Sequence, residues 1–230
     1  MRVRKKRNGE RRLAACAHLL TPKPREAFGE TADKPLRIEI GCGKGKFITE
    51  TACRSSEYNY IAMELVTDVI MLAMEKAMAL PGGCPDNLRF YCGNADRIDE
   101  LFPPHSVDRI FLNFSDPWPK ARHAKRRLTY HTFLDRYRRV LREGGDVVVK
   151  TDNDGLYDFT LEELTGAGWT ITEQTRDLHG SPFAEGNVMT EYEQAFSQKG
   201  KNINYVRAVA PSDAQQTCSG SDGAEEKSGV

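Results

Sequence analysis

The sequence predicts an α/β fold, a mainly parallel sheet with helices on both faces and an antiparallel edge. Short apolar runs alternate with amphipathic segments over most of the 230 residues, which is typical of βαβ units. The apolar run Leu36–Ile40 leads through a glycine-rich turn into a helical segment, as nucleotide-binding βαβ units begin. Two late extended runs, near residues 170 and 194, have no helix between them. They predict the antiparallel edge.

Three parts are expected along the chain. Residues 1–35 form a basic N-terminal arm and a short helix over residues 13–20, and residues 36–210 form one folded domain. Residues 211–230 are rich in Ser, Gly and Glu and are expected to be disordered. No signal peptide and no membrane span is predicted. The six cysteines show no zinc-binding spacing. We therefore expect a cytoplasmic protein without a metal site.

The charges are balanced overall but not evenly placed. Lys plus Arg and Asp plus Glu both total 33, so net charge excludes no class of partner. Residues 2–12 carry seven basic side chains against one acid, and residues 120–142 carry nine against one. Such clusters predict a surface for a polyanion. The alternative is a solvated helix face and a loose terminus.

The first half of the domain alternates strands and helices regularly. Strands are expected at residues 36–40, 60–63 and 88–92, and helices at about 46–53, 66–80 and 97–102. The methionines of the third range, at 71, 74 and 78, fall at helical spacing. We interpret them as core residues.

The second half contains the longest apolar strand and more irregular chain. Strands are expected at residues 107–114, 146–150, 169–175, 190–197 and 203–209, and helices at 129–141 and 155–167. Residues 177–189 are rich in turn formers and are expected to form a loop.

The glycine-rich turn and the strand ends beside it suggest a nucleoside-containing cofactor. The spacing is GxGxG, and Lys46 stands where a dinucleotide fingerprint has its third glycine. This disfavours a pyrophosphate ligand and favours S-adenosylmethionine. Glu64 ends the next strand about 20 residues further on, where an acid receives ribose hydroxyls. Its alternative role is that of an acid at a helix N-terminus. Asn94 follows the third strand and could bond an adenine amine.

The strand at residues 107–114 breaks into Ser-Asp-Pro-Trp-Pro-Lys, residues 115–120. Ligands bind outside the carboxyl ends of strands in open α/β sheets, and the two prolines stiffen the loop. Asp116, Trp118 and Lys120 provide a carboxylate, an indole and an ammonium. These groups suit a flat base, so we predict that a nucleobase meets the reactive cofactor here. Trp118 either packs on that base or braces the loop.

These motifs together resemble one known family. The turn with its preceding acid, Glu64, the pair Asn94-Ala95, the loop 115–120, Lys150-Thr151-Asp152 and the TEYE run at 190–193 are similar to bacterial tRNA (guanine-N7)-methyltransferases. The resemblance covers about residues 1–209. It implies a Rossmann-like class I methyltransferase domain with a seven-stranded sheet. It also implies methyl transfer from S-adenosylmethionine to the variable-loop guanine at position 46 of tRNA, giving 7-methylguanosine.

The resemblance also implies site residues. The cofactor would contact Glu39, Gly41, Gly43, Gly45, Glu64, Asn94, Ala95 and Asp116, and Asp116 would also be catalytic. The tRNA would contact Lys120, Asp152, Thr190, Glu191, Tyr192 and Glu193. Asn94 stands where many members carry Asp. No metal and no membrane is implied, and both a monomer and a homodimer remain open.

The chemistry of the expected reaction needs no general base, because guanine N7 has a free lone pair in the ring plane. Positive charge develops on the base, so a nearby carboxylate would favour the transfer; Asp116 is the candidate. Three alternatives are an adenine-N6 methyltransferase, an inactive RNA-binding protein on this fold, and a nicotinamide oxidoreductase. The separated prolines of the 115–120 loop disfavour the first, and the intact glycine turn disfavours the second.

Overall fold

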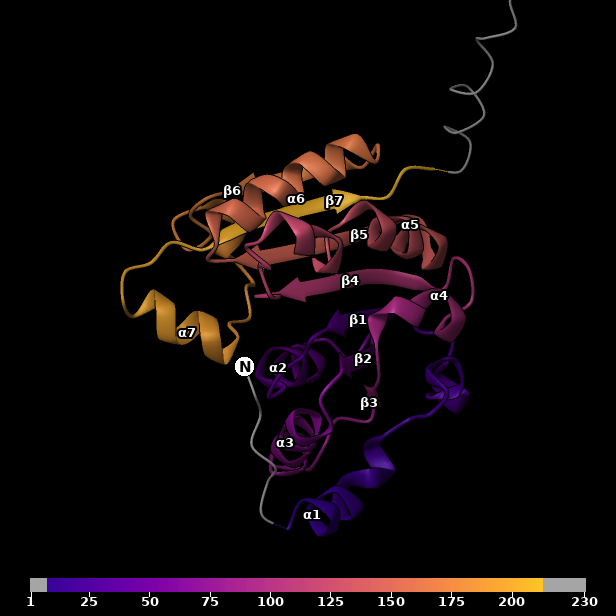
Figure 1. The fold of residues 1–230 in the computed structure, drawn as a ribbon. Helices are drawn as coiled ribbons and strands as arrows, with labels where there is room; N and C mark the ends of the chain where they lie inside the picture. The colour runs from indigo at the N-terminus through magenta and orange to yellow at the C-terminus, as the bar shows by residue number, and fades with distance from the viewer. Residues whose placement is uncertain (1–7, 213–230) are drawn as a thin grey trace, which may run out of the picture.

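A computed structural model describes residues 8–212 and contains one seven-stranded sheet (Figure 1). The strand order is β3-β2-β1-β4-β5-β7-β6, and β1 to β5 are parallel. β7 runs antiparallel to both of its neighbours. The strands are β1 Leu36–Ile40, β2 Asn59–Glu64, β3 Leu88–Cys92, β4 Val107–Asn113, β5 Leu141–Thr151, β6 Thr170–Thr175 and β7 Asn204–Val209.

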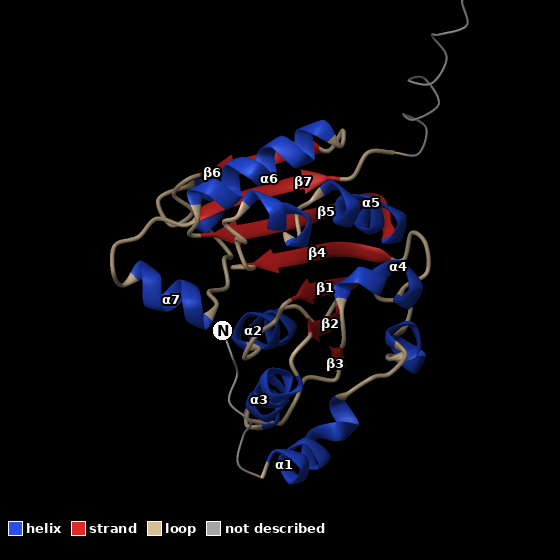
Figure 2. Ribbon diagram, viewed as in Figure 1, coloured by secondary structure: helices blue, strands red, loops and turns tan. Residues whose placement is uncertain are grey.

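Helices cover both faces of the sheet (Figure 2). One hydrophobic cluster joins the sheet to α4, α5 and α6, and a second joins it to α1, α2 and α3. α7 lies beyond the ends of β4 and β5, away from both layers. The helices are α1 Gly9–Cys16, α2 Lys46–Arg54, α3 Thr67–Met78, α4 Ile98–Leu101, α5 His131–Val140, α6 Asp154–Gly166 and α7 Glu191–Ser197.

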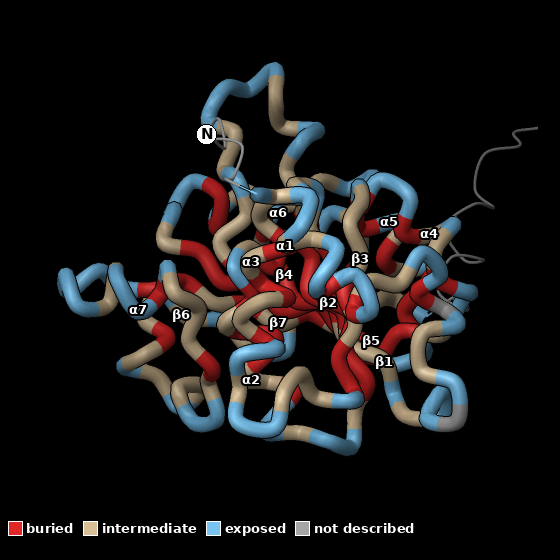
Figure 3. Tube along the Cα trace, turned by 90° about the horizontal axis from the view of Figure 1, so that it is seen from below, coloured by how far each residue is buried: buried red, intermediate tan, exposed pale blue. Residues whose placement is uncertain are grey.

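The core lies along the strands, as Figure 3 shows. Ile38, Ile110 and Val147 are fully buried toward α5 and α6, and Tyr60, Met74 and Phe90 are fully buried toward α3. Met71 and Met74 belong to this second cluster, which confirms their prediction as core, whereas Met78 is exposed. The predicted fold class is confirmed.

The strand expected at residues 190–197 is wrong, because this segment is the helix α7. Thr190 Oγ1 accepts a hydrogen bond from the Glu193 N–H (2.9 Å), and the Glu193 carboxylate accepts one from the Thr190 N–H (3.4 Å). This reciprocal capping box starts a helix. The alternation of apolar and polar residues at 190–197 therefore does not indicate a strand. The antiparallel partner of the edge strand β6 is β7 instead.

Other boundaries shift at the chain ends and around α5. The helix expected at residues 13–20 begins earlier, at Gly9, and ends in a 3₁₀ turn, Ala17–Leu19. The strand expected at residues 146–150 begins earlier, at Leu141, directly after α5. Within the basic arm, Arg12 donates to the Glu75 carboxylate of α3, so its C-terminal part is folded. Residues 1–7 and most of the predicted tail lie outside the described residues, and the three-part division stays a prediction.

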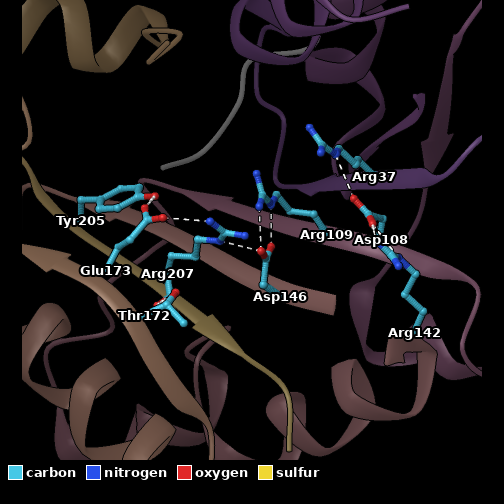
Figure 4. Close-up of polar contacts among 9 residues, drawn as sticks. All are labelled: Arg37, Asp108, Arg109, Arg142, Asp146, Thr172, Glu173, Tyr205 and Arg207. Atoms are coloured by element: carbon cyan, nitrogen blue, oxygen red, sulfur yellow. Dashed lines mark hydrogen bonds and ion pairs between the residues drawn. The ribbon is translucent and has the colours of Figure 1, made fainter. Parts of the chain in front are cut away.

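A network of ion pairs covers one face of the sheet at the start of β4 and β5 (Figure 4). Asp146 accepts from Arg109 (2.5 and 2.7 Å) and from Arg207 (2.6 Å). Glu173 of β6 accepts from Arg207 (2.8 Å) and from the Tyr205 hydroxyl (2.6 Å). These bonds connect the four neighbouring strands β4, β5, β7 and β6.

The turn between β1 and α2 requires glycine at position 45 for packing. Gly45 has φ +79°, and a Cβ there would lie 2.7 Å from Ala73 Cβ of α3. Gly45→Ala is therefore expected to lower the free energy of unfolding by about 2 kcal/mol or more, from left-handed strain and overpacking.

Urea unfolding of both proteins measures this effect. The matched control is Gly166→Ala in α6, where a Cβ meets nothing within 4 Å and φ is not positive. It should be neutral or stabilising by up to about 1 kcal/mol. Equal stability of Gly45→Ala and the wild type would contradict the packing argument.

Candidate active site

A cavity of about 560 Å³ opens at the carboxyl ends of β1 to β4. Its walls include Gly41 after β1, Glu64 of β2, Asn94 and Ala95 after β3, and Asp116 after β4. Five of the residues predicted to contact the cofactor therefore line one cavity. Glu39, Gly43 and Gly45 do not line it.

Glu64 holds the glycine-rich turn in place. Its carboxylate accepts hydrogen bonds from the backbone N–H groups of Gly43 and Val66, both at 3.1 Å. Gly41 and Gly43 have φ of +78° and +56°, and a Cβ at either position would meet no atom within 4 Å. Their backbone conformation thus favours glycine, while Glu64 both fixes the turn and faces the cavity.

Glu39 lies below the cavity in a buried pair with Asn113. Asn113 Nδ2 donates to Glu39 Oε1 at 2.8 Å, and the side chains are 1% and 7% exposed. Burial raises the pKa of Glu39 to about 7. Glu39 Oε2 and Asn113 Oδ1 are buried acceptors without a donor among the described residues. Asn113 also lines the cavity, so the buried pair adjoins the cavity wall.

The other end of the cavity offers an apolar surface and an amide. Leu65 is 64% exposed although it is a large apolar side chain, and it lines the cavity with Ala95. The Asn94 side chain caps the turn after β3, accepting from the Asp96 N–H at 3.1 Å. Its amide is therefore engaged locally and does not point freely into the cavity.

The loop after β4 is held in an unusual conformation. Phe114 and Trp118 have φ of +53° and +40°, although neither is glycine. Arg127 donates to the carbonyl groups of Pro117 (3.0 Å) and Trp118 (3.1 Å). The Trp118 ring packs against His123, at 5.7 Å between centroids, and below the Arg126 guanidinium. Trp118 therefore braces the loop and also lines the cavity.

Asp116 is the acid that this loop presents to the cavity. It is exposed, and among residues 8–212 its carboxylate has no hydrogen-bond or ion-pair partner. Lys120 is also exposed, at the start of the 3₁₀ segment Ala121–Arg126, and lies outside the cavity lining. The loop thus leaves one carboxylate free beside the cavity and one ammonium free on the adjoining surface.

Two of the residues predicted to bind the substrate, Asp152 and Tyr192, meet beside this loop, at the ends of β4 and β5. The Tyr192 ring lies 5.0 Å from that of Phe114 and 4.2 Å from that of Phe196. The Tyr192 hydroxyl donates to Asp152 at 3.4 Å, and Lys201 Nζ lies 2.8 Å from the same carboxylate. These side chains form an aromatic and polar surface next to Asp116.

Three members of the TEYE run have structural partners. Thr190 caps α7, and Glu191 forms an ion pair with Lys76. Glu193 is fully buried, which removes it from the surface that a large substrate could reach. Tyr192, 43% exposed, is the member that presents most of its side chain.

The arginines of the second basic cluster divide into two groups. Arg136, Arg139 and Arg142 pair with Asp96, Asp99 and Asp108, respectively. The basic residues at 120, 122, 125 and 126, two lysines and two arginines, are exposed and lie at the end of the loop that carries Asp116 and in the 3₁₀ segment after it. The available positive charge therefore lies at the 3₁₀ segment and not along α5, where the sequence also placed it.

Comparisons with known proteins show where the chain belongs. A family model described as "Putative methyltransferase" matches residues 33–206. A tRNA (guanine-N(7)-)-methyltransferase of Lachnoclostridium phytofermentans is 49% identical over 80% of this chain and 83% of its own length. A protein of the same name from Lactiplantibacillus plantarum is 43% identical over 87% of this chain and 94% of its own.

The chain belongs to the family of tRNA (guanine-N7)-methyltransferases. Solved structures agree with the fold. An antibiotic-related methyltransferase has a TM-score of 0.57 and 17% identity, covering 80% of this chain and 90% of its own. The antibiotic-resistance methyltransferase Kmr has a TM-score of 0.55 and 17% identity, with coverage of 79% and 90%.

Three residues that contact or support the candidate site were not predicted as site residues from the sequence. Asn113 is the last residue of β4, and the sequence does not distinguish it from other strand residues. Arg127 is one of several consecutive basic residues, so its role does not stand out in the sequence. Lys150 was noticed only as part of a motif. The position of Asn113, two residues before the 115–120 loop, is a signal that the sequence does contain. The contacts of Arg127 and Lys150 depend on the tertiary structure, so the sequence contains no signal for them.

None of the helices within residues 8–212 is long and apolar enough to cross a membrane. In the same part of the chain, no group of three or more His, Cys, Asp or Glu side chains could hold a metal ion.

Glu39→Gln should change how stability depends on pH. The folded protein holds the Glu39 proton to about pH 7, whereas the unfolded chain releases it near 4.5. The folded state therefore binds more protons in this range, so wild-type stability falls as the pH rises. Gln carries no such proton. Relative to the wild type, the variant should gain about 2 kcal/mol of unfolding free energy between about pH 5 and about pH 8.5.

Urea unfolding of both proteins without cofactor at the two pH values measures the difference. Asp99→Asn is the control, because Asp99 pairs with the exposed Arg139. If the difference in unfolding free energy between the wild type and Glu39→Gln does not change with pH, Glu39 is not a buried acid with a raised pKa.

Proposed function

We infer that this protein transfers a methyl group from S-adenosylmethionine to N7 of a guanine in tRNA, forming 7-methylguanosine. The relatives of this name, at 41–49% identity over most of the chain, support this inference. The structural observation that carries it is the cavity, which sets the glycine turn and Glu64 opposite the free carboxylate of Asp116. We propose the variable-loop guanine at position 46 as the target.

The residues around the cavity fit S-adenosylmethionine. The unpartnered acceptors Glu39 Oε2 and Asn113 Oδ1 suit the ammonium of its methionine part. Glu64 suits the ribose hydroxyls because it ends β2 beside the turn. Exposed Leu65 with Ala95 suits the adenine ring, and Asn94 stands beside them. Gly41 permits a close approach of backbone to ligand. We propose that Gly43 and Gly45 act through the shape of the turn.

The bound cofactor supplies an electrophilic methyl group on a sulfonium. The chain must then place guanine N7 in line with the carbon–sulfur bond at about 3–3.5 Å. The N7 lone pair forms the new bond, and the old bond's electrons leave with sulfur, so no proton has to be removed. Asp116 favours the cationic product base electrostatically. It can also accept from the guanine N1–H or amino group and so orient N7.

The surface around Asp116 suits a folded RNA. We propose that Lys120 and the exposed cations of the 3₁₀ segment contact phosphates, which provides most of the affinity of such complexes. We propose that Asp152, Thr190, Glu191 and Tyr192 also contact the tRNA. Tyr192 packs on Phe114 and offers an aromatic face for stacking an extruded base. The cytoplasm, where tRNA is modified, stays the predicted location.

The other reaction classes fit less well. An adenine-N6 enzyme must accommodate an exocyclic amine beside adjacent prolines, whereas here Trp118 separates them and braces the loop. An inactive binding protein has no need of a free carboxylate facing the glycine turn.

Incubation with labelled S-adenosylmethionine and unmodified tRNA, followed by nucleoside analysis, tests the function. We expect label in 7-methylguanosine only. A transcript made with 7-deazaguanosine, which lacks N7, should accept none. Label in N6-methyladenosine, or none in any nucleoside, would reject the proposal.

Asp116→Ala should fold and bind the cofactor but lose most methyl transfer. Loss of one preorganised electrostatic group costs about 100-fold or more in kcat. Asp116→Asn keeps the shape of the side chain and should still lose most of this factor. Single-turnover kinetics with saturating tRNA measures it, and near-normal turnover of both variants would remove Asp116 from the mechanism.

Glu64→Ala should chiefly weaken cofactor binding, by about 10-fold or more, because bonds to a charged carboxylate are lost. Calorimetric titration with S-adenosylhomocysteine measures the affinity. Glu100→Ala removes an exposed ion pair with Arg97 and should bind normally. An unchanged affinity in Glu64→Ala would contradict the role given to Glu64.

A further inference from the structure

Lys150, near the end of β5, has a buried ammonium with three partners. Its Nζ donates to Glu193 Oε2 (2.7 Å), to the Val188 carbonyl (2.9 Å) and to Asn187 Oδ1 (3.1 Å). The Lys150 side chain is 3% exposed and that of Glu193 is not exposed. A charge this deeply buried is tolerated only when it is paired and hydrogen-bonded. All three partners lie within residues 187–193, which comprise the chain just before α7 and its first turn.

Glu193 uses both of its oxygens inside the same stretch. Oε1 accepts from Asn187 Nδ2 at 2.7 Å and lies 2.9 Å from His179 Nε2, and Oε2 accepts from Lys150. The Glu193 carboxylate thus contacts His179, Asn187 and Thr190. Lys150 connects this carboxylate to the sheet. Glu193 is too buried and too fully bonded to contact tRNA itself.

The attached stretch carries the exposed surface beside the reaction centre. Tyr192 precedes Glu193 directly, and its ring packs on Phe114 at the start of the loop that bears Asp116. Its hydroxyl reaches Asp152, two residues after Lys150. α7 itself lies outside the two helical layers (Figure 1). The position of Tyr192 relative to Asp116 therefore depends on how α7 is fixed to the end of β5.

We propose that Lys150 is a positioning residue for methyl transfer, which through its buried ion pair with Glu193 sets α7 and Tyr192 where they present the target nucleotide to Asp116. The proposal rests on the proposed function. The proposal assigns Glu193 to an ion pair inside the protein instead of a direct contact with the substrate. It gives Lys150, the lysine of the Lys-Thr-Asp motif, a role in placing the substrate. Lys150 touches neither reactant.

The test compares Lys150→Met with a matched buried ion pair. Arg109→Met removes a partly buried guanidinium that pairs with Asp146, and these two side chains are 20% and 3% exposed. The two sites are four residues apart along β4 and β5, roughly 13 Å, and the Arg109 guanidinium donates to Asp146 rather than to Glu193. Both variants lose a buried charge, so both should unfold at a lower temperature. Only Lys150→Met should affect the placement of Tyr192.

Three measurements on folded protein separate placement from general destabilisation. In Lys150→Met, amide hydrogen exchange should accelerate within residues 179–197, and kcat/KM for tRNA should fall about 10- to 100-fold. Its affinity for S-adenosylhomocysteine should stay within about threefold of the wild type. Arg109→Met should match the wild type in all three measurements. Lys150→Arg keeps the charge and should recover part of the loss.

Glu193→Gln replaces Lys150→Met in these measurements if Lys150→Met does not fold. Gln keeps the volume of the side chain and one hydrogen-bond acceptor. The same changes in hydrogen exchange and kcat/KM are expected, but smaller. Normal kcat/KM in these variants, or an equal loss in Arg109→Met, would overturn the proposal. Inactivity of the wild type on tRNA would instead refute the proposed function. The exchange measurement would still report whether Lys150 holds α7, and unchanged exchange would reject that step.

Discussion

The end of β4 imposes the constraint on which the site depends. Phe114 leaves the strand with φ +53° while its N–H donates to the Lys150 carbonyl of β5 at 2.8 Å. A side-chain-bearing residue in this region costs about 1 kcal/mol or more, and Trp118 repeats the strain four residues later. Arg127 and the packing of the Trp118 ring hold the loop against it. The result is a rigid turn that directs an otherwise unpartnered carboxylate to the cavity.

In the proposed site the same two strand ends adjoin both reactants. On the proposed cofactor side, Asn113 connects β4 to the buried Glu39 of β1. On the proposed substrate side, Phe114 packs on Tyr192, and Lys150 joins β5 to Glu193 of α7. A displacement of either strand end would move donor and acceptor sites together. Positioning of this kind is what an N7 methylation requires, since the reaction itself needs no base and only alignment and charge.

The local parts of this site could be predicted from the sequence. The glycine turn, Glu64 and the loop at residues 115–120 each follow directly from a strand, and parallel strands bring their carboxyl ends to one edge. The resemblance carried in these motifs also predicted the family. Contacts between distant residues could not be predicted: Lys150 and Glu193 are 43 positions apart, and nothing in either segment indicates the pairing. The segment at residues 190–197 was mistaken for a strand because its alternation outweighed its capping box.

The basic clusters also show which features the sequence predicts and which depend on the tertiary structure. The sequence predicted a polyanion surface from charge counts, but counts do not show which charges are already paired. The acids that neutralise Arg136, Arg139 and Arg142 come from α4, the turn before it and β4. Within residues 8–212, the exposed cations of this cluster that form no ion pair lie at residues 120–126, beside the strained loop. The surface that we propose for RNA is therefore smaller than the charge counts predict, and it adjoins the loop that carries Asp116.

The structure of the protein with tRNA and S-adenosylhomocysteine tests the central claim most directly, by locating the target guanine relative to Asp116. The account predicts that N7 faces the cofactor sulfur inside the cavity, with the Asp116 carboxylate within hydrogen-bond distance of the base and the loop unchanged. A guanine held elsewhere, or an Asp116 turned away from the ring, would contradict it.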